Sequence, residues 1–309
     1  MIGALLTVYV LSAILIGSPA IVFYPLWFIL LFSLSSVTQA LSVVDDTGQE
    51  VILDHSAQRI VTLAPHLTEL LFSLQAGERI IATVEHSDYP EAARLIPRIG
   101  GAEEISAEVI LTLEPDLVLA WDKGSPAEVI ALLRSLGVVV YRASSQSLEG
   151  VSKTLADLAV LTGQSELAVP LIADFKSEIM HTKVRYQHNK TVNVFYQLWN
   201  DPLMTANKQQ MINEMITLCG GVNLFAEQLE VVPQTSVESI LLLNPDVIVA
   251  PQQGTPVDWR QRWQAWPEIT AVSQQHLYTL DADLISRPTL RSVQGLKQLC
   301  ILLDKVRSE

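Results

Sequence analysis

Polar and aromatic side chains follow several apolar runs of this sequence, at points where strands are expected to end. Ligands of α/β proteins bind beyond the carboxyl ends of strands. Aromatic faces at such positions suit a large, flat, partly apolar ligand, and a carboxylate beside a guanidinium suits its polar edge. We therefore expect a ligand-binding set made of His66, Tyr89, Trp121, Trp199, Asp283 and Arg287.

Each member of this set also has a purely structural explanation. His66 could cap a helix, Tyr89 could close a surface turn, and the two tryptophans could pack at strand ends. Asp283 and Arg287 are four residues apart, a spacing at which an ion pair on one helix contributes a few tenths of a kcal/mol. Both explanations stay open at this point.

Motifs of common catalytic sites are absent from the sequence. It contains no Walker loop, GxGxxG, GxSxG or HExxH pattern and no Cys/His cluster with metal spacing. Trp259, Trp263 and Trp266 are spaced by four and three residues, which favours the buried stripe of a short helix over a cofactor site. A hydrolase or metalloenzyme that uses His66, His86 and Asp88 is a remote alternative.

A repeat organises most of the chain. Residues 106–120 (SAEVILTLEPDLVLA) and 236–250 (SVESILLLNPDVIVA) share eight identities without a gap, at an offset of 130. In each copy a serine caps a helix, a glutamate follows in its first turn, a proline ends it and a buried strand comes next. Two copies of one helix-strand unit predict two similar α/β lobes.

The expected fold is therefore α/β, with a central, mostly parallel sheet in each lobe and a long backbone helix between the lobes. Residues 41–147 form the predicted N-terminal lobe, 148–190 a helical connector and 191–309 the C-terminal lobe. Within the connector, Gly163 and Gln164 separate two helices, and Ser165 is a candidate cap for the second. Further strands are expected at 59–63, 79–83, 138–141, 192–197 and 277–280.

Charge is distributed unevenly along the 309 residues. The formal net charge is −13, from 33 acids and 20 bases, which excludes nucleic-acid binding through a basic surface. Residues 1–40 contain no Asp, Glu, Lys or Arg and carry two apolar runs, followed by Thr38-Gln39-Ala40. We expect this segment to be a signal peptide cleaved near Ala40, or an N-terminal membrane anchor.

Two pairs of residues depend on this expectation of export. Cys219 and Cys300 would tend to form a disulfide in an exported protein, the alternative being two buried free thiols. Glu108 and Glu238 occupy the same place in the two copies of the repeat. Either they only stabilise helix starts, or each lobe presents one acid to a basic partner with two-fold symmetry.

The chain resembles the periplasmic substrate-binding proteins of the cobalamin and ferric-siderophore class, over about residues 43–304. The resemblance rests on the opening Val43 to Gly48, Arg59 to Leu70, Ser87 to Pro90, both Pro-Asp strand entries and Cys219 to Phe225. It implies a fold like that of class III periplasmic binding proteins. It also implies a non-catalytic receptor that captures cobalamin or a related corrinoid and delivers it to an ABC transporter.

The resemblance also assigns roles to residues. It implies that Tyr89 contacts the corrin, that Asp283 and Arg287 lie on the opposite lip of the cleft, and that Cys219 pairs with Cys300. Glu108 and Glu238 match the acids that dock onto arginines of the permease dimer, whose ATPase subunits complete the importer. The free receptor is expected to be a monomer in the periplasm.

Two departures from the family pattern affect the ligand. Tryptophans of the family's cobalamin binder are missing from the segments that match residues 100–103 and 231–233. Trp199 lies one residue from a family aromatic position and is expected to compensate. The alternative ligands are a ferric siderophore and haem, the latter through Tyr89 or His66.

Overall fold

The computed structural model describes residues 40–101, 104–144, 146–252 and 259–309. The segment 1–39, for which we expect a signal peptide or anchor, lies outside the described residues, as do Ala102 and Glu103 of the segment that departs from the family pattern. Among the helices that the structure describes, none is both long and apolar enough to cross a membrane.

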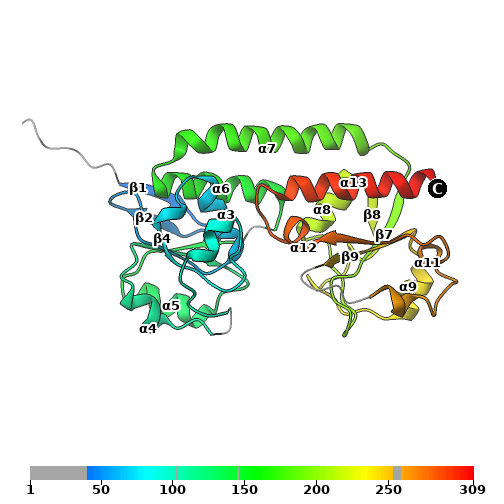
Figure 1. Cartoon of the computed structure of the whole chain (residues 1–309), viewed down its shortest axis with the longest axis horizontal. Coiled ribbons are helices and arrows are strands. Elements are labelled where there is room, and N and C mark those ends of the chain that lie inside the picture. The colour runs from blue at the N-terminus through cyan, green and yellow to red at the C-terminus, as the bar shows by residue number, and fades with distance from the viewer. Residues whose placement is uncertain (1–39, 102–103, 145, 253–258) are drawn as a thin grey trace, which may run out of the picture. The chain divides into compact units, whose positions relative to one another are not determined.

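The N-terminal lobe (Figure 1) is built on a four-stranded parallel sheet. The strand order in this sheet is β4-β3-β5-β6. The strands are β3 (Ile60–Thr62), β4 (Ile80–Ala82), β5 (Leu117–Trp121) and β6 (Val140–Ala143). Between them run helices α3 (Pro65–Ser73), α4 (Ala107–Thr112) and α5 (Ala127–Ser135) and the 3-10 turns η1 (Gly77–Arg79) and η2 (Glu91–Leu95).

The C-terminal lobe repeats this arrangement, with the order β10-β9-β7-β8. Its strands are β7 (Val192–Tyr196), β8 (Gly221–Asn223), β9 (Val247–Gln252) and β10 (Leu277–Asp281), and its helices are α8 (Met211–Leu218), α9 (Val237–Leu243), α10 (Arg260–Trp263), α11 (Thr270–Ser273) and α12 (Ala282–Ile285). In each sheet the strand that comes second in the chain, β4 or β8, lies at one edge, next to the strand that comes first, β3 or β7. The predicted α/β fold with two similar lobes is confirmed.

The two aspartates of the repeat, Asp116 and Asp246, form equivalent hydrogen bonds in the two lobes. Asp116 accepts hydrogen bonds from the backbone N–H groups of Gln58 and Arg59 at 2.7 and 3.0 Å, just before β3. Asp246 accepts one from Asn193 at 2.7 Å, at the start of β7. Each carboxylate therefore ties the entry of one strand to that of its neighbour, which is a structural reason for the Pro-Asp pair.

Two helices connect the lobes. The helix α6 (Leu148–Thr162) ends at Gly163, whose φ of 68° lies in the left-handed region that favours glycine. The second connector helix, α7 (Ser165–Tyr186), has Gln164 at its N-cap position and no side-chain cap. The expectation that Ser165 caps this helix is therefore wrong, because Ser165 is already its first helical residue.

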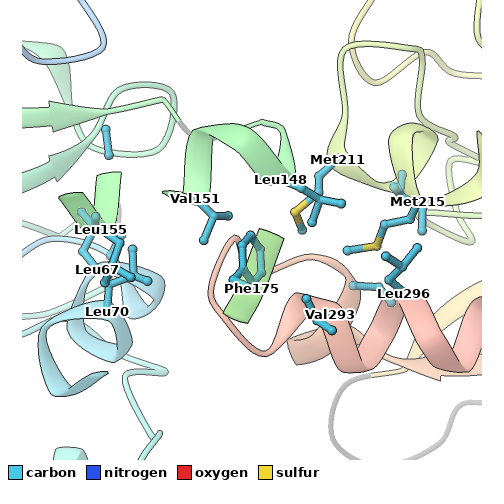
Figure 2. Packing of buried hydrophobic residues seen from close by; sticks show 14 of the residues in the cluster. Leu67, Leu70, Leu148, Val151, Leu155, Phe175, Met211, Met215, Val293 and Leu296 are labelled. Carbon is cyan, nitrogen blue, oxygen red and sulfur yellow. The ribbon is translucent and has the colours of Figure 1, made fainter. Parts of the chain in front are cut away.

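One apolar core runs through both lobes. Figure 2 shows Leu67 of α3 and Leu155 of α6 at one end of it, Phe175 of α7 in the middle and Met215 of α8 at the other end. The C-terminal helix α13 (Ser292–Ser308) contributes Leu296, among others. Two smaller cores fill the opposite faces of the two sheets. The lobes are thus packed together and not only tethered.

An antiparallel hairpin, β1 (Leu41–Val44) and β2 (Glu50–Leu53), precedes the first sheet and was not expected from the sequence. Val51 and Leu53 alternate with exposed residues and enter the shared core. Lys153 of α6 donates to the carbonyl of Val44 at 2.9 Å. The hairpin therefore packs against the connector.

A disulfide joins Cys219, directly after α8, to Cys300 of α13. It holds the last helix against the C-terminal lobe and closes a loop of 81 residues. Both half-cystines are fully buried. The alternative of two free thiols is thus excluded.

Replacing both half-cystines by alanine should lower the free energy of unfolding by about 4 kcal/mol, because the unfolded chain regains the freedom that the loop removes. Urea denaturation of the oxidised wild type and the double variant measures the difference. Reduced wild type is the control, since it should unfold close to the variant. Equal midpoints for the oxidised protein and the variant would contradict this account.

Candidate functional site

A pocket of about 530 Å³ opens on the C-terminal lobe, at the carboxyl ends of its strands. Three members of the predicted set, Trp199, Asp283 and Arg287, line it. Trp199 is 62% exposed, which excludes the explanation that it is a buried packing residue at a strand end. The other lining residues are Gln197, Leu198, Asn200, Ala250, Pro251, Gln252, Trp259, Ala282 and Ser286.

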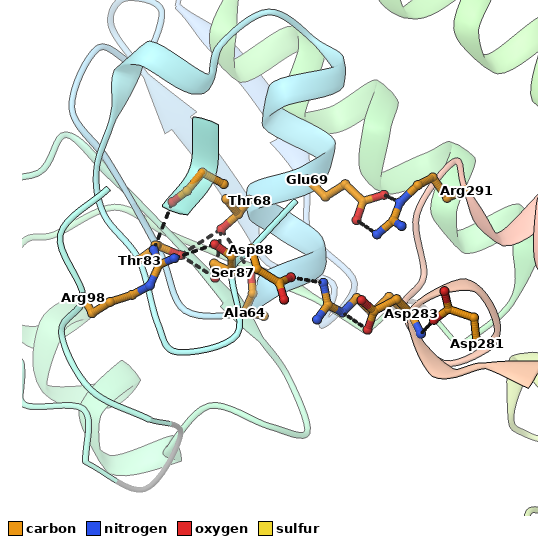
Figure 3. Close-up of polar contacts among 12 residues, drawn as sticks. Ala64, Thr68, Glu69, Thr83, Ser87, Asp88, Arg98, Asp281, Asp283 and Arg291 are labelled. Atoms are coloured by element: carbon orange, nitrogen blue, oxygen red, sulfur yellow. Dashed lines mark hydrogen bonds and ion pairs between the residues drawn. The ribbon is translucent and has the colours of Figure 1, made fainter. Parts of the chain in front are cut away.

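Arg287 connects this pocket to the N-terminal lobe. Its guanidinium donates to Asp88 Oδ1 at 2.8 Å, and its Nε lies 3.0 Å from Asp283 Oδ1 (Figure 3). The local ion pair expected between Asp283 and Arg287 is present, but the same arginine also reaches across to the other lobe. Burial alone would raise the pKa of Asp88, yet the hydrogen bond and charge of Arg287 hold it below its usual value.

A second arginine makes a parallel connection. Arg291 precedes α13 and donates from Nε and Nη2 to the two oxygens of Glu69, both at 2.7 Å (Figure 3). Its guanidinium carbon lies 3.7 Å from the centre of the Tyr89 ring. Glu69 is 2% exposed and Tyr89 44%. Tyr89 therefore has one face covered by the cation and remains partly open to solvent.

Buried hydroxyl groups support the loop that carries Asp88 and Tyr89. Thr62 of β3 donates to Thr83, which in turn donates to Ser87, at 2.7 and 2.8 Å. Arg98 donates to the backbone carbonyl of Ser87 at 2.6 Å (Figure 3). These bonds fix the residue directly before Asp88. The loop after β4 is thus positioned by the interior of the lobe.

His66 lies in the first turn of α3, at the end of β3. The helix has Ala64 at its N-cap and no side-chain cap, so the explanation of His66 as a cap is wrong. Its ring meets that of Trp121, the last residue of β5, edge to face at 5.7 Å between centroids. Among the described residues, Nε2 of this buried ring has no hydrogen-bond partner. Desolvation, with the nearby charge of Arg287, lowers its pKa to about 3.

Trp259, Trp263 and Trp266 belong to or pack against one core, but only Trp263 lies within a helix, α10, and Trp259 also lines the pocket. Trp263 is fully buried and Trp259 is 8% exposed, both in the core on the outer face of the second sheet. The indole N–H of Trp263 donates to the amide oxygen of Gln197 at 2.7 Å. One packing residue thus orients an amide that lines the pocket.

Glu108 and Glu238 lie in the first turns of α4 and α9 and are exposed in both lobes. Ser106 and Ser236 cap the two helices through the backbone N–H groups three residues later. The helices α4 and α9 lie on the same side of the molecule, away from α7 (Figure 1). A hydrogen bond from Ser106 lowers the pKa of Glu108, and a backbone hydrogen bond lowers that of Glu238. Both acids are therefore charged and accessible.

Glu69 and Arg291 were not predicted from the sequence. Glu69 had a detectable signal, because it interrupts the buried run from Leu67 to Leu71, where a carboxylate requires a partner. Its partner, Arg291, is 222 residues away and could not be identified from spacing.

Among the described residues, no three His, Cys, Asp or Glu side chains gather as a group able to hold a metal ion.

The chain belongs to the periplasmic binding protein family, whose model matches residues 60–284. A vitamin B12-binding protein of Vibrio cholerae serotype O1 is 34% identical over 248 residues, which are 80% of this chain and 89% of that protein.

Solved structures of periplasmic binding proteins also match the fold of this chain. The periplasmic vitamin B12 binding protein BtuF of Vibrio cholerae matches with a TM-score of 0.75 and 32% identity, over 82% of this chain and 99% of that one. The periplasmic heme-binding protein RhuT of Roseiflexus matches with a TM-score of 0.73 and 26% identity, over the same shares. Relatives of this fold therefore carry names of two different large ring ligands.

The lowered pKa of His66 predicts a pH dependence of stability. In the unfolded chain the His66 ring binds a proton near pH 6.5, whereas in the folded protein it does so only near pH 3. The free energy of unfolding therefore falls as the pH decreases from about 6.5 to about 3. The contribution is at most about 1.4 kcal/mol per pH unit. Urea denaturation at pH 7, 5.5 and 4.5 should show a steeper loss for wild type than for His66→Gln. His55→Gln, at an exposed position, is the control and should keep the wild-type slope; equal slopes for all three proteins would refute the assignment.

Proposed function

We propose that this protein captures cobalamin or a related corrinoid in the periplasm and delivers it to an ABC permease. The observation that carries the proposal is the meeting of aromatic and charged groups from both lobes around Arg287, next to a pocket lined by Trp199. Tyr89 offers a partly open ring on the other lobe. The names of the relatives from Vibrio cholerae support a corrinoid as the ligand.

In this proposal Tyr89, Trp121 and Trp199 contact the ring of the ligand, and Asp283 and Arg287 bind its polar edge. The buried ring of His66 packs edge to face against the Trp121 indole and helps to hold it in position. The protein performs no catalysis and needs no cofactor; cobalamin is its cargo. It acts as a monomer that is exported, with residues 1–40 either cleaved near Ala40 or kept as a tether to the inner membrane.

Haem or a ferric siderophore is the second candidate ligand. The similarity to a heme-binding protein favours haem, as does the partly exposed Tyr89, whose phenol is a possible iron ligand. His66 is a poorer candidate because its ring is 4% exposed. A direct comparison of ligands separates the two candidates.

Calorimetric titration with cyanocobalamin should show one site with a dissociation constant between micromolar and nanomolar, about −8 to −12 kcal/mol. Trp199→Ala should weaken binding by about tenfold, because the exposed ring would lose its contact with the corrin. Trp199→Phe is the matched control, since it keeps an aromatic face and most of the affinity. Tight binding of haemin or of a ferric siderophore, with none of cyanocobalamin or cobinamide, would refute the proposed ligand.

Docking is tested separately. The double variant Glu108→Ala, Glu238→Ala should bind cyanocobalamin as wild type does, yet show at least about tenfold lower uptake, since two exposed charge pairs to the permease would be lost. Uptake in cells that depend on this receptor is the measurement. Glu166→Ala, an exposed acid in the first turn of α7 on the other side of the molecule, is the control. Unchanged uptake by the double variant would remove the proposed docking role.

A further inference from the structure

Among the described residues that line the pocket, Arg287 is the single cation, and its charge is already neutralised. Two carboxylates flank it, Asp88 at 2.8 Å and Asp283 at 3.0 Å, and its side chain is 11% exposed. The two carboxylates balance the charge of this guanidinium, so that its remaining N–H groups offer no net positive charge to a carboxylate on a ligand.

The charged side chains that contact this arginine and its neighbour Arg291 are acidic. Arg291, the neighbouring cation, has its Nε and Nη2 engaged by both oxygens of Glu69. A further acid, Asp281, lies near Asp283; burial, with the charges of Asp88 and Asp281, raises the pKa of Asp283. Three carboxylates are therefore paired with two guanidinium groups, and the carboxylate of Asp281 accepts from the backbone N–H of Asp283 beside them.

The same pocket is rich in side-chain amides. Gln197, Asn200 and Gln252 line it. Trp263 holds the amide oxygen of Gln197, and the amide nitrogen of Gln197 lies 3.4 Å from Asn200 Oδ1. Amides both donate and accept hydrogen bonds without carrying charge, so this wall can pair with neutral polar groups of a ligand.

We propose that the pocket selects ligands whose periphery carries amides and rejects those that carry carboxylates. A ligand amide can donate to Asp88 or Asp283 and exchange hydrogen bonds with the three pocket amides. A ligand carboxylate meets two acids that already occupy the nearest cation, which is repulsive at short range in a partly desolvated site. This inference rests on the proposed function and deepens it, because corrinoids have a rim of amides whereas haem carries two carboxylates.

Matched ligand pairs test the inference. Cyanocobalamin is compared with its b-, d- and e-monocarboxylic acids, which differ from it by one amide each, and haemin is compared with its bis-amide. Wild type should bind the amide form at least tenfold more tightly than the acid in the porphyrin pair and for at least one of the three corrinoid acids. Ratios near one throughout either series, for ligands that the protein binds, would overturn the inference.

The variant Asp88→Asn, which preserves shape and removes one charge, should free Arg287 and reduce the amide-to-acid preference by about tenfold. Glu91→Gln is the matched control. It removes the same charge at a position three residues after Asp88, where Glu91 forms an exposed ion pair with Arg94. Its amide-to-acid ratio should equal that of wild type. An unchanged ratio in Asp88→Asn, or an equal change in both variants, would overturn the inference.

The outcomes separate this inference from the proposed function. If wild type binds no corrinoid but prefers the porphyrin bis-amide over haemin, the proposed ligand is wrong and the charge selection holds. If it binds cyanocobalamin and all three of its acids equally, the proposed function holds and the charge selection is wrong. Failure to bind any amide form would overturn both.

Discussion

Leu155 of α6 and Phe175 of α7 pack in the same apolar core as Leu67 of the N-terminal lobe and Met215 of the C-terminal lobe. Each such side chain contributes about 1.5–3 kcal/mol when it is buried. Separating the lobes by a large angle would expose part of this core, so that the connection resists wide opening. The two sheets therefore present the carboxyl ends of their strands to one another with little freedom to reorient.

The charged contacts between the lobes depend on this rigidity. Burying Glu69 with Arg291 costs several kcal/mol in lost hydration, and only a well-aligned, two-point contact offsets it. Such alignment requires that α3 and the start of α13 stay fixed within a fraction of an ångström. The packed core supplies this constraint, and the ion pair in turn holds Tyr89 by its covered face.

The repeat was sufficient to predict the fold, because eight matched residues encode a cap, a helix, a stop and a buried strand twice. Local patterns failed where stability comes from distant partners. The short edge strand β8 contains Gly221 and Asn223, which are poor strand formers, and it forms because β7 lies beside it. Trp199 and Arg287 were found from their position after strands, whereas Arg291 lies in no recognisable pattern and its role depends on two distant partners, Glu69 and Tyr89.

The two ends of the duplicated unit have diverged to different degrees. Ser106 and Glu108 recur as Ser236 and Glu238, and both pairs have the same capped geometry at the surface. At the other end of the same unit, Trp121 is the last residue of β5, but Pro251 stands at the matching place in β9. Under the proposed function, a two-fold symmetric permease would impose the same requirement on both lobes, whereas a ligand with unlike edges would require different side chains from each. Identity at one end and difference at the other are what a receptor needs when it binds an asymmetric cargo and docks on a symmetric partner.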